Sequence, residues 1–162
     1  MFENREVLWG IAPIGWTNDD MPQLGGENTF EQCVSEAALA GFQGTEVGGK
    51  YPTNPQLLKK AMELRGLKIA SQWFSSYLCE KPYAENKREF VKQLDFLESV
   101  GANRINVCEL TRCLFASKES MFGEAKPVAT DSEWEKLSSG LDKLGRIAHQ
   151  RGFKLCFHQN SD

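Results

Sequence analysis

The sequence lacks the paired cysteines of a zinc ribbon or a disulfide framework. Its five cysteines are an odd number, and no two of them stand in C-x-x-C spacing. It also lacks an apolar run long enough to cross a bilayer, and its start does not have the charged-then-apolar pattern of a secretory signal. These absences argue against a secreted or membrane-spanning protein and predict a cytoplasmic chain with reduced thiols.

An excess of positive charge is missing as well. Nineteen Lys and Arg against twenty-two Asp and Glu leave a formal net charge of −3. Because sequence-independent binding to nucleic acid or anionic lipid needs a basic surface, this balance argues against both partners. The composition, 41% hydrophobic and 25% charged, is ordinary for a globular protein, and 162 residues suit a single domain over 1–162.

What the sequence does have is a regular alternation of short apolar runs with longer amphipathic segments. The apolar runs predict strands, and the segments with apolar residues at helical spacing predict helices. The expected strands are 8–16, 42–47, 67–74, 104–110 and 153–158. The expected helices are 30–40, 55–65, 87–100 and 132–150.

Capping residues support the predicted helix starts. Thr29 stands three positions before Gln32, which is a capping-box spacing. Asn54 precedes Pro55, and proline is well tolerated in the first helical position because its missing N–H has no helical partner there. Asp131 is the expected cap of the last helix.

A strand-helix alternation of this kind predicts parallel strands joined by right-handed crossovers, in an open sheet or in a barrel. No G-x-G-x-x-G turn follows the first strand, which disfavours a nucleotide-binding sheet. A (β/α) barrel of the TIM type takes about 250 residues, so about five strands and four helices cannot close one. We therefore expect either a longer parent chain or edge-to-edge pairing with a second copy, since open edges and an exposed apolar face favour association.

Polar residues stand where the predicted strands end, which is the edge that carries the chemistry of parallel α/β folds. Glu46, Glu109 and His158 end the second, fourth and fifth strands. A buried carboxylate needs a partner, and a metal ion, a lysine or a substrate hydroxyl can supply it. Glu and His suit Mn²⁺, Co²⁺ or Zn²⁺. The structural alternative is that Glu46 pairs with Lys50 and that His158 is a core histidine.

Three further features are candidates for the site. Trp16 and Trp73 are either apolar walls for a ring-shaped ligand or core residues. Cys108 ends a strand, but we interpret it as a small buried hydrophobe rather than a nucleophile. The irregular segment 111–130 is long enough to be an active-site loop.

The motifs GIAPIGWTNDD at 10–20 and EVGGKYP at 46–52 resemble a known family. Together with AGF at 40–42 and FEQC at 30–33, they are similar to the opening half of the 2-keto-myo-inositol dehydratase (myo-inosose-2 dehydratase) family. That family has a xylose-isomerase-like TIM barrel. The resemblance covers essentially the whole of this chain but only the N-terminal half of the family's length.

The resemblance implies a metal-assisted carbon–oxygen lyase of inositol catabolism that removes water from 2-keto-myo-inositol, a cyclic polyol ketone. It further implies Mn²⁺ or Co²⁺ and glutathione as cofactors. Most metal ligands of related barrels lie on later strands, so it also implies an incomplete site here. The alternatives are a sugar isomerase or epimerase on the same barrel and a non-catalytic half-barrel. The predicted catalytic residues and metal ligands are Glu109 and His158, and the predicted substrate-binding residues are Trp16, Glu46, Lys50 and Trp73.

Overall fold

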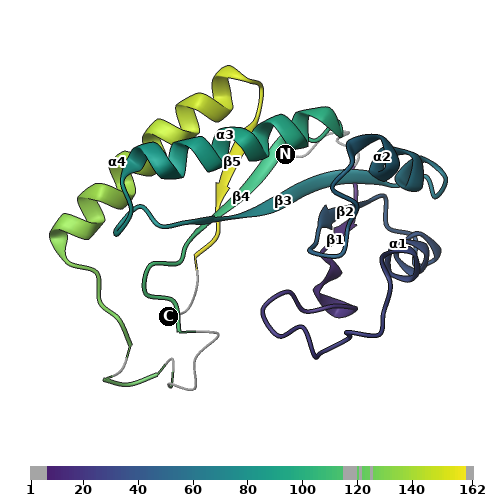
Figure 1. Ribbon diagram of the computed structural model, residues 1–162, viewed down its shortest axis with the longest axis horizontal. Coiled ribbons are helices and arrows are strands. Elements are labelled where there is room, and N and C mark those ends of the chain that lie inside the picture. The colour runs from purple at the N-terminus through teal and green to yellow at the C-terminus, as the bar shows by residue number, and fades with distance from the viewer. Residues whose placement is uncertain (1–6, 115–119, 121, 125, 160–162) are drawn as a thin grey trace. The chain divides into compact units, whose positions relative to one another are not determined.

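A computed structural model of the chain describes residues 7–114, 120, 122–124 and 126–159 (Figure 1). Two segments used in the sequence argument, the chain start at 1–6 and part of the 111–130 loop, lie outside these ranges. The elements, in chain order, are β1 (Gly10–Ile11), a 3-10 helix (Pro13–Gly15), α1 (Phe30–Leu39), β2 (Gly44–Val47), α2 (Pro55–Glu63), β3 (Lys68–Ser76), α3 (Tyr83–Ser99), β4 (Arg104–Glu109), α4 (Asp131–Gln150) and β5 (Lys154–Phe157).

The strands form a parallel sheet, as the alternation of elements predicts, and their order is β1-β2-β3-β4-β5. This sequential order is that of a barrel rather than of a doubly wound sheet. The chain divides into two compact units. The first comprises Met1–Ser71 and Ser99–Ala102, and the second comprises Gln72–Glu98 and Asn103–Asp162. Strand β3 contributes residues to both units, and the single domain expected over 1–162 stays a prediction.

In the first unit, α1 and α2 bury only part of the apolar faces that their spacing predicts. Val34 and Leu58 have no exposed surface. By contrast, the side chains at the edges of these faces are exposed, namely Leu39, Leu57 and Leu64. Phe30 packs edge-on against Tyr51, with 4.7 Å between the ring centroids. The Tyr51 hydroxyl lies 2.8 Å from the Thr45 hydroxyl of β2. These two buried hydroxyl groups therefore form a hydrogen bond with each other, as buried polar groups usually do.

In the second unit, α3 and α4 lie on the same side of the strands (Figure 1). Phe90, Leu94 and Leu144 are fully buried there, and the rings of Phe74 and Phe90 meet edge-on at 5.2 Å. At the end of α4, Arg151 forms ion pairs with acidic side chains of α3, including Asp95 at 2.8 Å.

Two predicted elements have bounds that differ from those of the structure by more than two residues. The first strand, expected over 8–16, is only Gly10–Ile11, because the chain turns at Pro13 and its carbonyl accepts the N–H groups of Trp16 and Thr17. The third helix begins at Tyr83, four residues before the predicted start, directly after Pro82. A proline at this point is compatible with a helix start.

The cap of α4 also differs from the expectation. Thr130 is the N-cap rather than Asp131: its hydroxyl accepts the Glu133 N–H, and the Glu133 carboxylate accepts the Thr130 N–H. Thr29 and Asn54 cap α1 and α2 as predicted. A reciprocal capping box satisfies two helix-start donors, whereas Asp131 alone would satisfy one.

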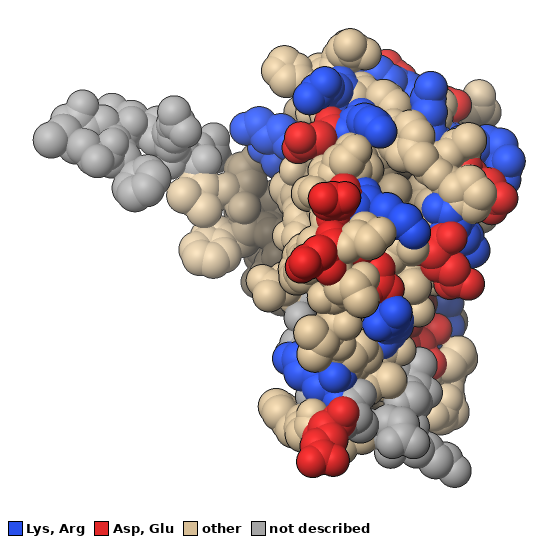
Figure 2. Space-filling view, turned by 90° about the vertical axis from the view of Figure 1, so that its left-hand side faces the viewer, with Lys and Arg blue, Asp and Glu red and all other residues tan. Residues whose placement is uncertain are grey.

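Charged side chains of both signs are interspersed on the face shown in Figure 2, as the near-balance of acidic and basic residues suggests. Within the described part of the chain, none of the helices is both long and apolar enough to cross a membrane.

Candidate functional site

The carboxyl ends of β4 and β5 lie next to each other in the second unit. Val107 pairs with Phe157 in parallel register, and its carbonyl accepts the His158 N–H at 2.8 Å. Glu109 and His158 therefore leave the sheet at one edge. This is the edge where loops converge on ligands in parallel α/β folds.

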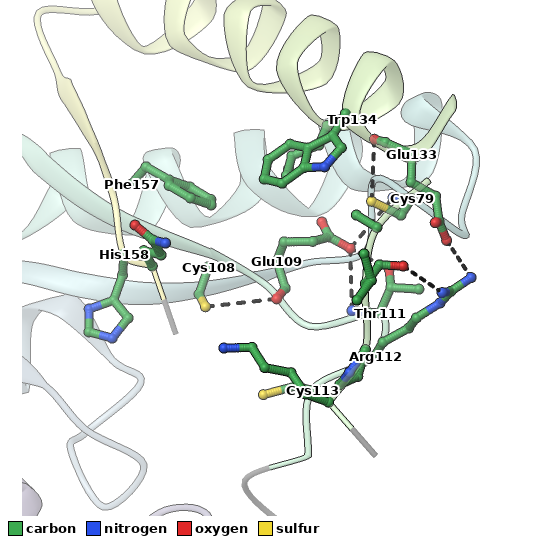
Figure 3. Close-up of a pocket in the computed structure, with 16 residues that line it drawn as sticks. Cys79, Cys108, Glu109, Thr111, Arg112, Cys113, Glu133, Trp134, Phe157 and His158 are labelled. Carbon is green, nitrogen blue, oxygen red and sulfur yellow. Dashed lines mark hydrogen bonds and ion pairs between the residues drawn. The ribbon is translucent and has the colours of Figure 1, made fainter. Parts of the chain in front are cut away.

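A cavity of about 520 Å³ opens at this edge (Figure 3). Its walls come from the ends of β4 and β5, the turn after β3, both arms of the 111–130 loop and the first turns of α4. The lining residues are Cys79, Cys108, Glu109, Thr111, Arg112, Cys113, Lys126, Pro127, Val128, Ala129, Glu133, Trp134, Leu137, Phe157, His158 and Gln159. The volume is within the range of small-molecule pockets.

Glu109 accepts hydrogen bonds from five donors. Oε2 accepts the Ser76 hydroxyl and the Leu78 N–H, both at 2.8 Å. Oε1 accepts the N–H groups of Thr111 at 3.3 Å and Cys79 at 3.5 Å, and it also accepts the Thr111 hydroxyl. Ser76 stands directly opposite Glu109 in the β3–β4 pairing, which explains how the contact forms.

His158 lies on the other side of Cys108 from the Glu109 carboxylate (Figure 3). Its imidazole packs edge-on against the indole of Trp73, with ring centroids 4.9 Å apart. The Trp73 indole N–H donates to the Ser75 hydroxyl at 3.1 Å, and Trp73 does not line the cavity. The structure thus brings Glu109 and His158 into the wall of one cavity, and it places Trp73 behind His158.

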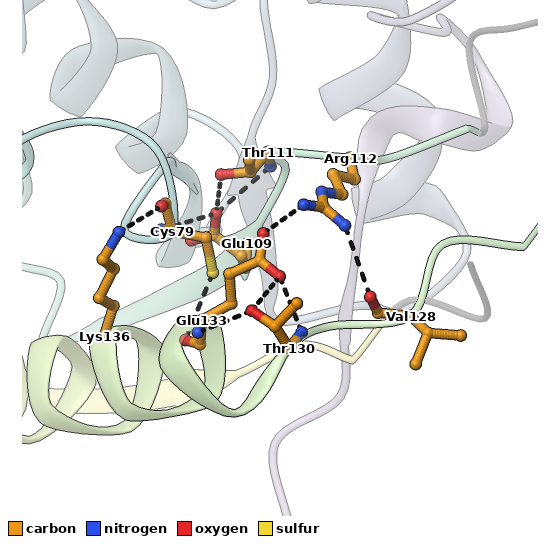
Figure 4. Close-up of polar contacts among 8 residues, drawn as sticks. All are labelled: Cys79, Glu109, Thr111, Arg112, Val128, Thr130, Glu133 and Lys136. Atoms are coloured by element: carbon orange, nitrogen blue, oxygen red, sulfur yellow. Dashed lines mark hydrogen bonds and ion pairs between the residues drawn. The ribbon is translucent and has the colours of Figure 1, made fainter.

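A polar network joins the 111–130 loop to α4 (Figure 4). Arg112 forms an ion pair with Glu133 at 2.6 Å and donates to the Val128 carbonyl at 3.4 Å. Hydrogen bonds from Thr130 lower the pKa of the Glu133 carboxyl, and the Arg112 charge acts in the same direction. Both arms of the loop are therefore fastened to the start of α4.

Three cysteines line this cavity, and the environment of one of them, Cys79, favours the thiol. The structure places none of the five cysteines in a disulfide, as the absence of C-x-x-C spacing suggests. Burial, followed by the nearby charges of Glu109 and Glu133, raises the pKa of Cys79 to about 11. Cys108 is buried, as predicted. Since the thiolate is the nucleophile, Cys79 is not activated for covalent chemistry at neutral pH.

Trp16, Glu46 and Lys50 belong to the first unit. The Trp16 indole donates to the Glu36 carboxylate at 2.5 Å, and Glu46 accepts the Ser71 hydroxyl at 3.1 Å. The Lys50 ammonium donates to three backbone carbonyls, those of Gly25 at 3.2 Å, Gly26 at 2.8 Å and Asn28 at 2.6 Å. Lys50 thereby holds a loop of its own unit, and the cavity shared by Glu46, Glu109 and His158 stays a prediction.

The described residues do not by themselves form a metal centre. Among the described residues, no group of three or more His, Cys, Asp or Glu side chains is arranged to hold a metal ion. Glu109, one of the two predicted ligands, already has its oxygens engaged with protein donors. The metal-ligand roles of Glu109 and His158 therefore gain no support from the geometry.

Sequence reasoning missed several cavity residues. Trp134 is an apolar residue of the amphipathic pattern over 132–150, which predicts a buried side chain, but 58% of it is exposed and it lines the cavity. Cys79, Thr111 and Arg112 are brought in by the turn after β3 and by the start of the 111–130 loop. The signal that could have found Trp134 is its place in the first turn of the helix that follows the candidate loop.

Curated relatives match the chain over almost its whole length, although no protein-family model matches it. An inosose dehydratase of Bacillus anthracis (strain CDC 684 / NRRL 3495) is 51% identical over 160 residues, which are 99% of this chain and 54% of the relative. An inosose dehydratase of Clostridium tetani (strain Massachusetts / E88) is 49% identical over the same lengths. The chain thus spans about half the length of the curated relatives it matches.

Solved structures with a similar fold are more distant in sequence. D-psicose 3-epimerase from Clostridium cellulolyticum H10 aligns with a TM-score of 0.63 at 15% identity, covering 93% of this chain and 52% of that one. A probable 3-DHS dehydratase from Bacillus anthracis aligns with a TM-score of 0.61 at 12% identity, covering 92% and 51%. At this identity the likeness concerns the fold alone. The resemblance read from the sequence is confirmed: this chain is homologous, over nearly all of its length, to about half of the inosose dehydratase chain, and its fold matches about half of a xylose-isomerase-like TIM barrel.

Proposed function

We propose that the chain forms half of a cytoplasmic inosose dehydratase, a carbon–oxygen lyase that removes water from 2-keto-myo-inositol in inositol catabolism. The observation that carries this proposal is the 51% identity over 160 residues to proteins named inosose dehydratase. The cavity at the carboxyl ends of β4 and β5 is the part of the substrate site that lies in this chain.

Elimination of water next to a ketone needs a base for the α-proton, stabilisation of the resulting enediolate, and an acid for the departing hydroxyl. Imidazole is the side chain most often used for such proton transfers. His158 lies in the cavity wall, held by its backbone bond to Val107 and by the face of Trp73. We assign the proton transfer to His158, with Trp134 and Phe157 as apolar walls against the ring carbons of the substrate.

Some roles implied by the resemblance stay predictions. Dependence on Mn²⁺ or Co²⁺ and on glutathione is one, and no step of the mechanism above depends on either. Substrate contacts by Trp16, Glu46, Lys50 and Trp73 are another. The third is that further barrel strands, from a longer chain or from a second copy, are needed to complete the site. Exposure of the Cys156 and Phe157 side chains of β5 agrees with this prediction, because further strands and their helices would cover them.

The test uses the two histidines of the chain as paired reporters. His158 lines the cavity, whereas His149 lies on the exposed surface of α4. We expect 2-keto-myo-inositol, titrated into the isolated chain, to shift the imidazole NMR signals of His158 and leave those of His149 unchanged. His149→Ala is the matched control, and it should bind as the unchanged chain does.

Turnover is followed in the same samples by ultraviolet absorption of the dione product, with and without added Mn²⁺, Co²⁺ and glutathione. Absence of any His158 shift at millimolar 2-keto-myo-inositol would overturn the proposal for this chain. An equal or larger shift with D-fructose would favour the isomerase or epimerase alternative instead.

A further inference from the structure

Glu109 is the most heavily hydrogen-bonded side chain of the cavity wall. A carboxylate offers about four lone-pair positions. Five donors converge on this one, and three of them are backbone N–H groups of Leu78, Cys79 and Thr111. The remaining two are hydroxyls, of Ser76 and Thr111, and the single Ser76 hydrogen is shared with the Cys108 carbonyl at 3.0 Å. Both oxygens of the Glu109 carboxylate are therefore engaged by protein donors, which disfavours binding of a metal ion or a substrate proton there.

Displacing these donors would leave part-buried N–H groups without an acceptor, which is unfavourable because such groups are almost always paired in folded proteins. The donors come from two separate segments: the turn after β3, which contains Leu78 and Cys79, and the first residue of the 111–130 loop. Both segments contribute to the cavity wall. One negative charge therefore connects the two segments that form this side of the cavity.

We infer that Glu109 is a positioning residue, which holds the turn after β3 and the start of the 111–130 loop as walls of the cavity, and that it is neither a metal ligand nor a general base. This inference deepens the proposed function, since the walls belong to the proposed substrate site. Its basis is the hydrogen-bond geometry alone, so it stands whichever ligand the cavity binds.

The wall held by Glu109 is continuous with α4. The Cys79 thiol donates to the Glu133 carbonyl at 3.6 Å, and the Lys136 ammonium donates to the Cys79 carbonyl at 3.4 Å (Figure 4). Arg112, next to Thr111, pairs with the Glu133 carboxylate. Loss of the Glu109 contacts should therefore loosen the turn and the loop first, and α4 only through them.

The experiment measures amide hydrogen exchange of Leu78, Cys79 and Thr111 in the full 162-residue chain. In the unchanged protein we expect all three amides to be protected. Glu109→Gln replaces one acceptor oxygen by an NH₂ group that faces N–H donors, so we expect exchange at these amides to rise by at least about tenfold, as for loss of a charge-assisted hydrogen bond. Glu109→Asp, which keeps the charge, should restore part of the protection.

Glu80→Gln is the matched control, because it removes an exposed charge from the same turn. It should leave the three amides within about twofold of the unchanged chain, as expected for a surface substitution. Unprotected amides in the unchanged chain, or equal protection in Glu109→Gln, would overturn the inference.

A metal titration of the unchanged chain covers the case in which Glu109→Gln does not fold. Substoichiometric Mn²⁺ is expected to leave the amide signals of Leu78 and Thr111 sharp. Broadening of these signals beyond that of the His158 amide would show Mn²⁺ at the carboxylate and would refute the positioning role, because paramagnetic broadening falls steeply with distance from the ion. Neither measurement depends on turnover, so failure of the inference and failure of the proposed dehydratase function remain distinguishable.

Discussion

Replacement of Gly140 by alanine should destabilise the protein, although glycine inside a helix is usually the less stable choice. Alanine is favoured over glycine by about 1 kcal/mol in a helix interior. However, a Cβ at this position of α4 would lie 2.7 Å from Leu78 Cδ2 and 2.9 Å from Cδ1. Ordinary carbon–carbon contacts are about 3.5–4.0 Å, and Leu78 is only 5% exposed. It therefore has little room to move away.

Overpacking of a buried contact costs about 1–3 kcal/mol. The helical gain of about 1 kcal/mol offsets part of this cost. Gly140→Ala should therefore lower the free energy of unfolding by about 0–2 kcal/mol. Gly145→Ala, in the same helix, is the matched control, because a Cβ there meets nothing within 4 Å. It should gain about 1 kcal/mol. The midpoints of urea unfolding of the two variants should therefore move in opposite directions.

The double variant Leu78→Ala/Gly140→Ala identifies the contact. If the collision is the cause, the two changes should be non-additive by about 0.5–3 kcal/mol, because the added methyl occupies part of the space that Leu78 leaves. A Gly140→Ala protein stabilised as much as Gly145→Ala would refute the packing argument. It would also show that the turn after β3 yields at Leu78, the residue whose N–H binds Glu109.

The remaining predictions concern titrating groups. Burial raises the pKa of the Tyr51 hydroxyl above that of the unfolded chain. The folded state therefore keeps its proton longer, and the resulting stability is present below about pH 10 and is lost as the pH rises further. Ultraviolet titration of tyrosinate should show that Tyr51 ionises only when the protein unfolds. The Tyr51→Phe variant assigns this signal, because the absorbance change on unfolding should be smaller by one tyrosinate. Ionisation of Tyr51 near pH 10 in the folded protein would contradict the expectation. With its pKa raised to about 11, Cys79 should react with iodoacetamide at pH 8 more slowly than the exposed Cys156. Peptide mass spectrometry measures both sites in one sample, and equal rates would show that the Cys79 thiol is not shielded.

The order of the elements and the parallel direction of the strands were predictable from the sequence. Both follow from local spacing, because apolar runs that alternate with amphipathic segments form parallel sheets with helical crossovers. The sequential strand order followed only from the choice of a barrel over a doubly wound sheet. Thr29 and Asn54 were recognisable as caps because a cap bonds N–H groups two or three residues away. The relation to inosose dehydratases was recognisable from contiguous motifs such as GIAPIGWTNDD, which need no tertiary information.

The roles of the strand-end charges depend on contacts between segments that are distant in the sequence. A carboxylate at position 109 is visible in the sequence, but its donors at Ser76, Leu78 and Cys79 lie about thirty residues away along the chain. Likewise, Lys50 binds the carbonyls of Gly25, Gly26 and Asn28, whereas the sequence left open a substrate contact or a pair with Glu46. Hydrogen-bond saturation depends on which backbone groups fold back onto a side chain. Residue type and spacing therefore locate a charged group at the edge of the sheet, while its role is determined by the loops that reach it.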